Sequence, residues 1–157
     1  MKTIKFLALA LAVVMLVFAF ASCKSTPKHT LTATVTVTAP DDPIVLNYST
    51  TIEYPEGETI SVLDVARQAL DEMEIKYELD ENSDGLALGF DSITTTEGTV
   101  YKVGYTDAEQ QYIGMWSYTV NDVVPDAGRA GKNPATDGSK IVFTYEVASV
   151  EELSQTP

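Results

Sequence analysis

Only one segment of this chain has the spacing of an amphipathic helix, and the other regular segments have the composition of strands. Residues 62–73 place apolar side chains three and four positions apart, which builds a continuous apolar stripe on one face. Ser61 precedes this stripe and can cap the first free N–H groups, with Asp64 three residues later. The pattern predicts a helix from Ser61 to about residue 74 that packs against a sheet.

Strands are expected on both sides of that helix. Residues 31–38 alternate apolar side chains with threonine, which is typical of a half-buried strand. The expected core-facing side chains of this strand are Leu31, Ala33, Val35 and Val37. Further strands are expected at residues 44–54, 75–79, 86–93, 99–105, 115–120 and 140–147, and a long loop at 125–138. Asn121 and Asp122 form a tight-turn pair, after which Val123 and Val124 are expected to begin a return strand.

The order of these segments predicts the fold class. Strands, then one helix, then more strands indicate an α+β domain with the helix on one face of a mixed sheet, in a β-grasp-like arrangement. We expect one domain at residues 31–147 and a polar tail at 148–157. A domain of about 110 residues can bury a core without disulfides.

The N-terminus has the composition of an export signal. Lys2 and Lys5 precede an unbroken apolar run, residues 6–21, which is too short for a comfortable membrane span. The sequence Phe-Ala-Ser-Cys that ends at Cys23 resembles the bacterial lipobox, in which the cysteine receives a diacylglycerol after cleavage. We therefore expect a signal peptide at residues 1–22 and a lipidated tether at residues 23–30. The alternative is an ordinary secreted protein in which Cys23 has no special role.

Cysteine count and charge agree with a lipid-anchored protein outside the cytoplasm. Cys23 is the only cysteine, so no disulfide is expected, and two or more acyl chains on it would give a stable anchor to the cell membrane or outer membrane. The mature chain has eight Lys and Arg against 23 Asp and Glu, a net charge of −15. Nucleic acid is therefore not an expected partner, because its binding needs a basic surface.

Four segments together resemble a known family. They are residues 59–66, residues 90–93, the Trp/Tyr segment at residues 114–121, and residues 137–145 with their Asp-Gly pair. The chain in this way resembles the transcobalamin-like C-terminal domain over residues 31–147. The resemblance implies a β-grasp fold and makes cobalamin, or another corrinoid, a candidate ligand. In the vitamin carriers this domain covers cobalamin together with a large helical domain, which this sequence does not predict.

The residues do not suggest catalysis. The one histidine, His29, lies in the expected tether, so no Ser-His-Asp or Cys-His arrangement can form within the domain. His29 could reach a corrinoid cobalt from a flexible segment, but a solvated linker residue is the simpler interpretation. No pair among the 23 carboxylates stands out as an acid/base pair. We expect a protein that is not an enzyme.

An aromatic cluster beside a glycine-rich loop supplies the candidate ligand-binding residues. They are Tyr112, Met115, Trp116 and Tyr118, together with Arg129 from the loop. Strand alternation sends Met115 to one face and both Trp116 and Tyr118 to the other. That second face is either part of the core or a platform for a planar ligand or a protein partner.

A second candidate is a calcium loop at residues 80–91. Asp80, Asn82 and Asp84 stand at alternate positions, Gly85 allows a sharp turn, and Asp91 falls at the twelfth place. A solvated acidic turn explains the same residues, so no metal ligand is assigned.

The sequence as a whole predicts an extracytoplasmic binding lipoprotein. Its ligand would be a corrinoid or another small cofactor-like molecule. The alternative is an adhesion or envelope-scaffolding lipoprotein that binds a protein or glycan.

Overall fold

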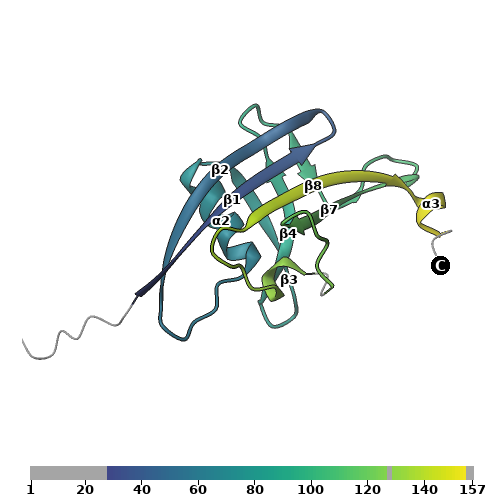
Figure 1. Ribbon diagram of the computed structural model, residues 1–157. Helices are drawn as coiled ribbons and strands as arrows, with labels where there is room; N and C mark the ends of the chain where they lie inside the picture. Colours follow the sequence, from purple (N-terminus) through teal and green to yellow (C-terminus); the bar gives the residue numbers. More distant parts are fainter. Residues whose placement is uncertain (1–27, 127–128, 155–157) are drawn as a thin grey trace, which may run out of the picture.

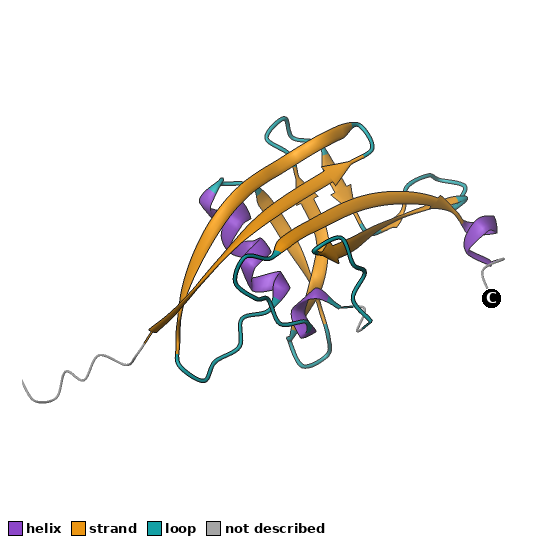
Figure 2. Ribbon diagram, viewed as in Figure 1, coloured by secondary structure: helices purple, strands orange, loops and turns teal. Residues whose placement is uncertain are grey.

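The structure, a computed structural model, describes residues 28–126 and 129–154 (Figure 1). The expected signal peptide and Cys23 lie outside the described residues. The α+β class is confirmed: a five-stranded mixed sheet, a three-stranded antiparallel sheet and one long helix form the fold (Figure 2). No helix in the described ranges is both long enough and apolar enough to cross a membrane.

The large sheet has the strand order β2-β1-β8-β7-β6. Its central pair, β1 and β8, is parallel, and every other pair is antiparallel. The strands are β1 (Lys28–Ala39), β2 (Asp42–Pro55), β6 (Gly104–Tyr105), β7 (Tyr112–Val120) and β8 (Lys140–Ser149). The start of β1 and the short C-terminal helix α3 (Val150–Ser154) lie at opposite ends of the molecule (Figure 1).

The alternation in β1 produces the two faces that the sequence predicts. Leu31, Ala33, Val35 and Val37 are buried beneath the sheet. The intervening threonines point to the other face, where they hydrogen-bond to polar side chains of β2, as Thr34 Oγ1 does to Ser49 Oγ at 3.2 Å. The inner face therefore carries the core, and the outer face is polar.

Helix α2 (Val62–Glu72) covers the inner face and begins with the predicted cap. The Ser61 hydroxyl accepts from the Asp64 N–H at 3.1 Å, and the Asp64 carboxylate accepts from the Ser61 N–H at 3.0 Å. This capping box satisfies N–H groups that the first turn leaves free. The helix buries its apolar stripe, which consists of Val62, Leu63, Val65, Ala66, Ala69 and Leu70.

The small sheet has the order β3-β4-β5, with β3 (Lys76–Glu81), β4 (Ala87–Thr94) and β5 (Val100–Lys102). Tyr145 of β8 connects this sheet to the large one, because its hydroxyl donates to the backbone oxygen of Lys102 at 2.6 Å. The ring of Tyr145 lies over Gly114 of β7, where a Cβ atom would overlap its hydroxyl. Only glycine leaves room for that contact.

Two expectations about the chain path are wrong. Val123 and Val124 begin no strand. Both are exposed, and their one strand-like contact is a bridge between Val123 and Val120. Strand β7 instead pairs with β8 along its whole length. His29 does not lie in a linker, because β1 begins at Lys28 and the His29 ring packs 5.8 Å from the Tyr54 ring. The pairing of β1 with β2 from residue 28 onward orders this part of the expected tether.

Candidate functional site

A cavity of about 210 Å³, which we call the aromatic cavity, lies between β4 and β7. It forms where two strand edges lose their partners. Within the described residues, β5 pairs only with residues 92–94 of β4, and β6 pairs only with residues 113–114 of β7. The lining residues are Asp80, Leu88, Gly89, Phe90, Val103, Met115, Trp116, Tyr118, Arg129, Ala130 and Phe143.

Four of the five residues proposed from sequence line this cavity. Met115, Trp116 and Tyr118 come from β7, and Arg129 reaches the cavity from the loop before η1 (Ala130–Lys132). Tyr112 does not join them. It lines a separate depression of about 450 Å³ with Gln110, Ser149 and Glu151, next to helix α3.

The aromatic walls of the cavity are continuous with the core. The Phe143 ring lies 5.1 Å from the Phe90 ring, edge to face, and 5.4 Å from the stacked Tyr118 ring. Tyr118 is buried, and burial raises the pKa of its phenol. Trp116 is half-buried and packs edge to face on Tyr145 at 5.1 Å. The face therefore belongs to the core, and its side chains also line the cavity; the ligand-platform interpretation stays a prediction.

Trp116 has one unusual feature. Its indole Nε1 is buried and has no hydrogen-bond partner among the described residues. A buried N–H without an acceptor costs free energy of roughly 1–3 kcal/mol. Trp116 is also the only tryptophan of the chain, so its fluorescence and its indole N–H signal both come from the wall of this cavity.

One ion pair marks the rim of the cavity. Arg129 Nη1 donates to Asp80 Oδ2, which joins two residues that lie 49 positions apart in the chain. Both side chains are about half exposed, at 54% and 44%. Asp80 and Arg129 are the only charged side chains among the residues that line the cavity.

The loop that carries Arg129 is fixed at several points. Asn133 Nδ2 donates to the Tyr118 hydroxyl and to the backbone oxygen of Arg129, the latter at 3.0 Å. The Val62 N–H donates to the Asn133 backbone oxygen at 2.8 Å, so the loop is also bonded to the start of α2. These contacts join the cavity wall to the helix and to β7.

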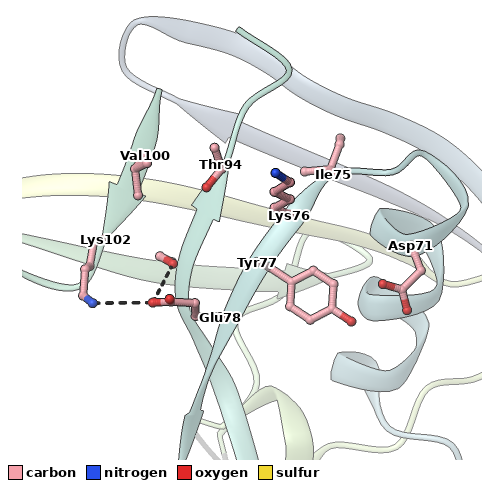
Figure 3. A pocket seen from close by; sticks show the side chains of 9 residues that line it. Asp71, Ile75, Lys76, Tyr77, Glu78, Thr94, Val100 and Lys102 are labelled. Atoms are coloured by element: carbon pink, nitrogen blue, oxygen red, sulfur yellow. Dashed lines mark hydrogen bonds and ion pairs between the residues drawn. The ribbon is translucent and has the colours of Figure 1, made fainter. Parts of the chain in front are cut away.

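A larger and more open depression, the β3–β5 groove, lies on the small sheet (Figure 3). Its volume is about 810 Å³, and it is lined by Asp71, Ile75, Lys76, Tyr77, Glu78, Ser92, Thr94, Val100 and Lys102. The sequence did not single out these residues, because their charges resemble an ordinary solvated strand face.

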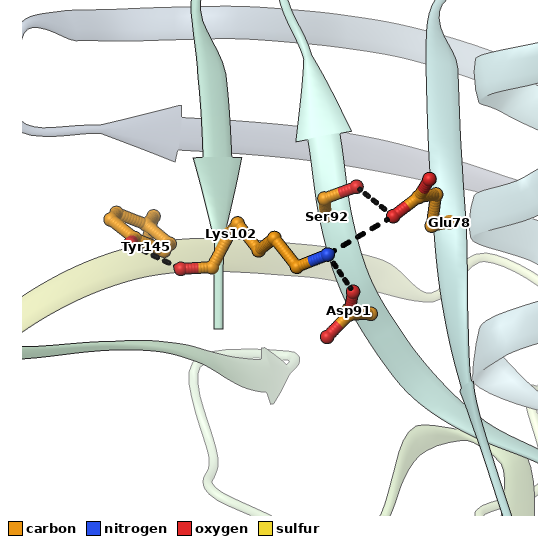
Figure 4. A network of polar contacts seen from close by, with 5 residues as sticks. All are labelled: Glu78, Asp91, Ser92, Lys102 and Tyr145. Atoms are coloured by element: carbon orange, nitrogen blue, oxygen red, sulfur yellow. Dashed lines mark hydrogen bonds and ion pairs between the residues drawn. The ribbon is translucent and has the colours of Figure 1, made fainter. Parts of the chain in front are cut away.

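Two charged groups of this groove, Lys102 and Glu78, pair with each other, and Lys102 also pairs with Asp91 of β4 (Figure 4). Lys102 Nζ lies 3.2 Å from Asp91 Oδ2 and 3.5 Å from Glu78 Oε2, and the Ser92 hydroxyl donates to the same Glu78 oxygen at 3.3 Å. Asp91, and then Glu78, raise the pKa of the Lys102 ammonium. Lys102 therefore stays protonated at neutral pH and does not supply a free amine as nucleophile or base.

Two side chains of the candidate calcium loop, Asp80 and Asn82, have partners within the protein. Asn82 Oδ1 accepts from the N–H groups of Asp84 at 3.0 Å and Leu86 at 2.8 Å, which makes a closed turn, and Asp80 pairs with Arg129. Within the described ranges, no group of three His, Cys, Asp or Glu side chains is placed to hold a metal ion.

Comparison with known proteins assigns no family. No family model matches the chain, and no curated protein matches it. Among solved structures, it resembles a crystal structure from Ruminococcus gnavus described as that of a candidate metal-binding protein. That match has 18% identity and a TM-score of 0.38, and it covers 75% of this chain and 98% of the other. The resemblance to transcobalamin-like domains stays a prediction.

Proposed function

We propose that this chain is a lipid-anchored extracytoplasmic binding protein and that the aromatic cavity holds its ligand. One observation carries the proposal: residues chosen from sequence for their chemistry, Met115, Trp116, Tyr118 and Arg129, line one cavity. Concave, mostly apolar sites with a few polar groups are the usual form of small-molecule sites.

The volume of the cavity limits what it can enclose. About 210 Å³ is less than the roughly 300–1,000 Å³ of pockets for drug-sized ligands, whereas an engineered cavity of about 150 Å³ holds benzene. The geometry therefore supports a ligand, or part of a ligand, the size of one ring with a short substituent. A corrinoid is much larger and would have to lie across the rim, in contact with Arg129.

The proposal does not include catalysis. In the β3–β5 groove, Lys102 is held as an ammonium between two carboxylates. At the aromatic cavity, the two charged side chains are paired with each other. In both arrangements the carboxylates are held in ion pairs with a cation and no nucleophile stands beside a base, so we propose a binding role rather than a reaction.

The experiment is a titration of the mature chain from residue 23 that carries Cys23→Ser. Cobalamin, cobinamide and a panel of single-ring compounds are added while calorimetry and Trp116 emission are recorded. We expect ring-sized compounds to change the emission, and Met115→Ala, which shortens a side chain that lines the cavity, to weaken the response. Tyr112→Ala is the matched control, because this exposed residue lies in the other depression.

The outcomes separate the versions of the proposal. No heat and no spectral change with either corrinoid at high micromolar concentration removes the corrinoid version. If no compound in the panel changes Trp116 emission, the aromatic cavity is not a binding site.

A further inference from the structure

We propose that the aromatic cavity binds an organic cation, a protonated amine or quaternary ammonium that carries one ring-sized apolar group. This inference rests on the proposed function, because it names the class of ligand for the same cavity. Three features of the site support it: the aromatic walls, the carboxylate at the rim, and the charge of the whole chain.

The walls favour positive charge. Phe90, Trp116, Tyr118 and Phe143 all line the cavity, and the faces of aromatic rings carry negative potential. A cation near such faces is attracted, and tryptophan is the strongest partner of this kind. Met115 adds a polarizable sulfur to the same lining, so the interior suits an apolar cation rather than a strongly hydrated one.

The rim has a carboxylate oxygen to spare. Arg129 binds Asp80 through Oδ2, and the described hydrogen bonds leave Oδ1 of Asp80 without a donor. An ammonium group can therefore bind Oδ1 while the ion pair stays intact. Arg129 likewise keeps N–H donors that this contact does not use, so the preference for a cation over an anion comes from the aromatic walls and from the net charge of the chain.

Acidic side chains on the flanking strands add to this preference. Glu81 follows Asp80 in β3, and Glu146 lies opposite Met115 in the β7–β8 pair. Asp91 follows Phe90, and its charge is neutralised by its ion pair with Lys102. The full chain has 23 acidic against 10 basic residues, and a field of that sign concentrates cations near the surface and repels anions.

The test uses three probes that share one ring and differ in charge: benzylammonium, benzyl alcohol and benzoate. Each is titrated calorimetrically into the mature chain carrying Cys23→Ser, with Trp116 emission as a second signal. We expect benzylammonium to bind about 3- to 30-fold tighter than benzyl alcohol, the range that a cation–π contact produces. Benzoate is expected to bind more weakly than the alcohol, and added salt should reduce the difference between the two ions.

A matched pair of variants locates the effect. Asp80→Asn removes the rim carboxylate without changing its shape. It should reduce the preference for benzylammonium over benzyl alcohol to the part that the aromatic walls supply, and it should improve benzoate binding. Asp84→Asn makes the same change of charge in the exposed turn nearby, away from the cavity lining, and should keep the preference. The Asp80–Arg129 pair is about half exposed, so its loss should leave folding intact.

The results distinguish two failures. If none of the probes produces heat or a change in Trp116 emission, the proposed function fails together with this inference. If the probes bind but benzoate binds as tightly as benzylammonium, or if Asp80→Asn leaves the preference unchanged, the cation inference is wrong and the binding site stands.

Discussion

Gly131 offers a sharp test of how the loop wall of the aromatic cavity is held. The loop crosses β4 there, and a Cβ atom at position 131 would overlap the Ala87 backbone oxygen and lie 3.2 Å from Ala87 C and 3.3 Å from Leu88 Cα. These are backbone atoms of a strand, and Ala87 is paired with Glu81 of β3. They cannot move aside as a flexible side chain can, so Gly131→Ala must lift the loop.

The expected cost follows from overpacking. Extra atoms in a well-packed site typically destabilise a protein by roughly 1–3 kcal/mol. For a domain of this size, about 4 °C of Tm corresponds to each kcal/mol, so the predicted fall is roughly 4–12 °C. Gly131 does not have a positive φ, so steric overlap rather than backbone strain is the cause.

Thermal unfolding followed by circular dichroism measures this effect, and Trp116 emission shows whether the cavity wall has opened. Gly89→Ala is the matched control, since it makes the same change in β4 at a position where a Cβ atom meets nothing within 4 Å. The control should change the free energy of unfolding by no more than about 0.5 kcal/mol. A Gly131→Ala variant with the wild-type Tm and wild-type emission would refute the packing of this loop on β4.

Three further predictions concern stability. Tyr145→Phe removes the donor to the Lys102 backbone oxygen and should lower the free energy of unfolding in urea by about 1–3 kcal/mol. An unchanged midpoint would mean that this contact does not hold the two sheets together. Ser61→Ala removes the helix cap and should cost about 0.5–2 kcal/mol; a loss below that range would contradict the capping box. Burial raises the pKa of the Tyr118 and Tyr145 phenols in the folded state. The contribution of the two phenols to the free energy of unfolding is therefore complete below their ordinary pKa of about 10, and it is lost as the pH rises through the raised pKa. Urea unfolding between pH 8 and 11 should show this decline in the free energy of unfolding, and the decline should be shallower in Tyr145→Phe. Equal declines in the two proteins would contradict a raised pKa for Tyr145.

Local features of the fold were predictable because short segments of sequence encode them. The alternation from Leu31 to Val37 fixes which face of β1 is buried, whatever strand lies beside it. Ser61 and Asp64 are three residues apart and complete a cap within one helical turn. Asn121 and Asp122 both have positive φ, as a tight turn at that pair requires.

Contacts between distant residues were not predictable. The parallel pairing of β1 with β8 and the separation into two sheets have no local signal. Val123 and Val124 suggested a return strand because they follow a tight turn, but β8, further along the chain, pairs with β7 instead.

The candidate site was predictable only in part for the same reason. Residue type pointed to Trp116, Tyr118 and Arg129, while the contact that places Arg129 at the rim spans 49 residues. Phe90 and Phe143 resembled ordinary core residues, and nothing in the sequence shows that they border a cavity. Tyr112 was grouped with β7 neighbours by sequence proximity, yet it lies at the far end of the strand in another depression.

The central claim is that ligand binds in the cavity beside Trp116, and nitrogen–proton correlation NMR tests it directly. The chain has a single tryptophan, so its spectrum has one indole N–H signal. The account predicts that benzylammonium shifts this signal progressively to saturation, while the amide signal of Tyr112 stays in place. A stationary indole signal, with shifts confined to Tyr112 or to Lys76 and Lys102 of the β3–β5 groove, would contradict it.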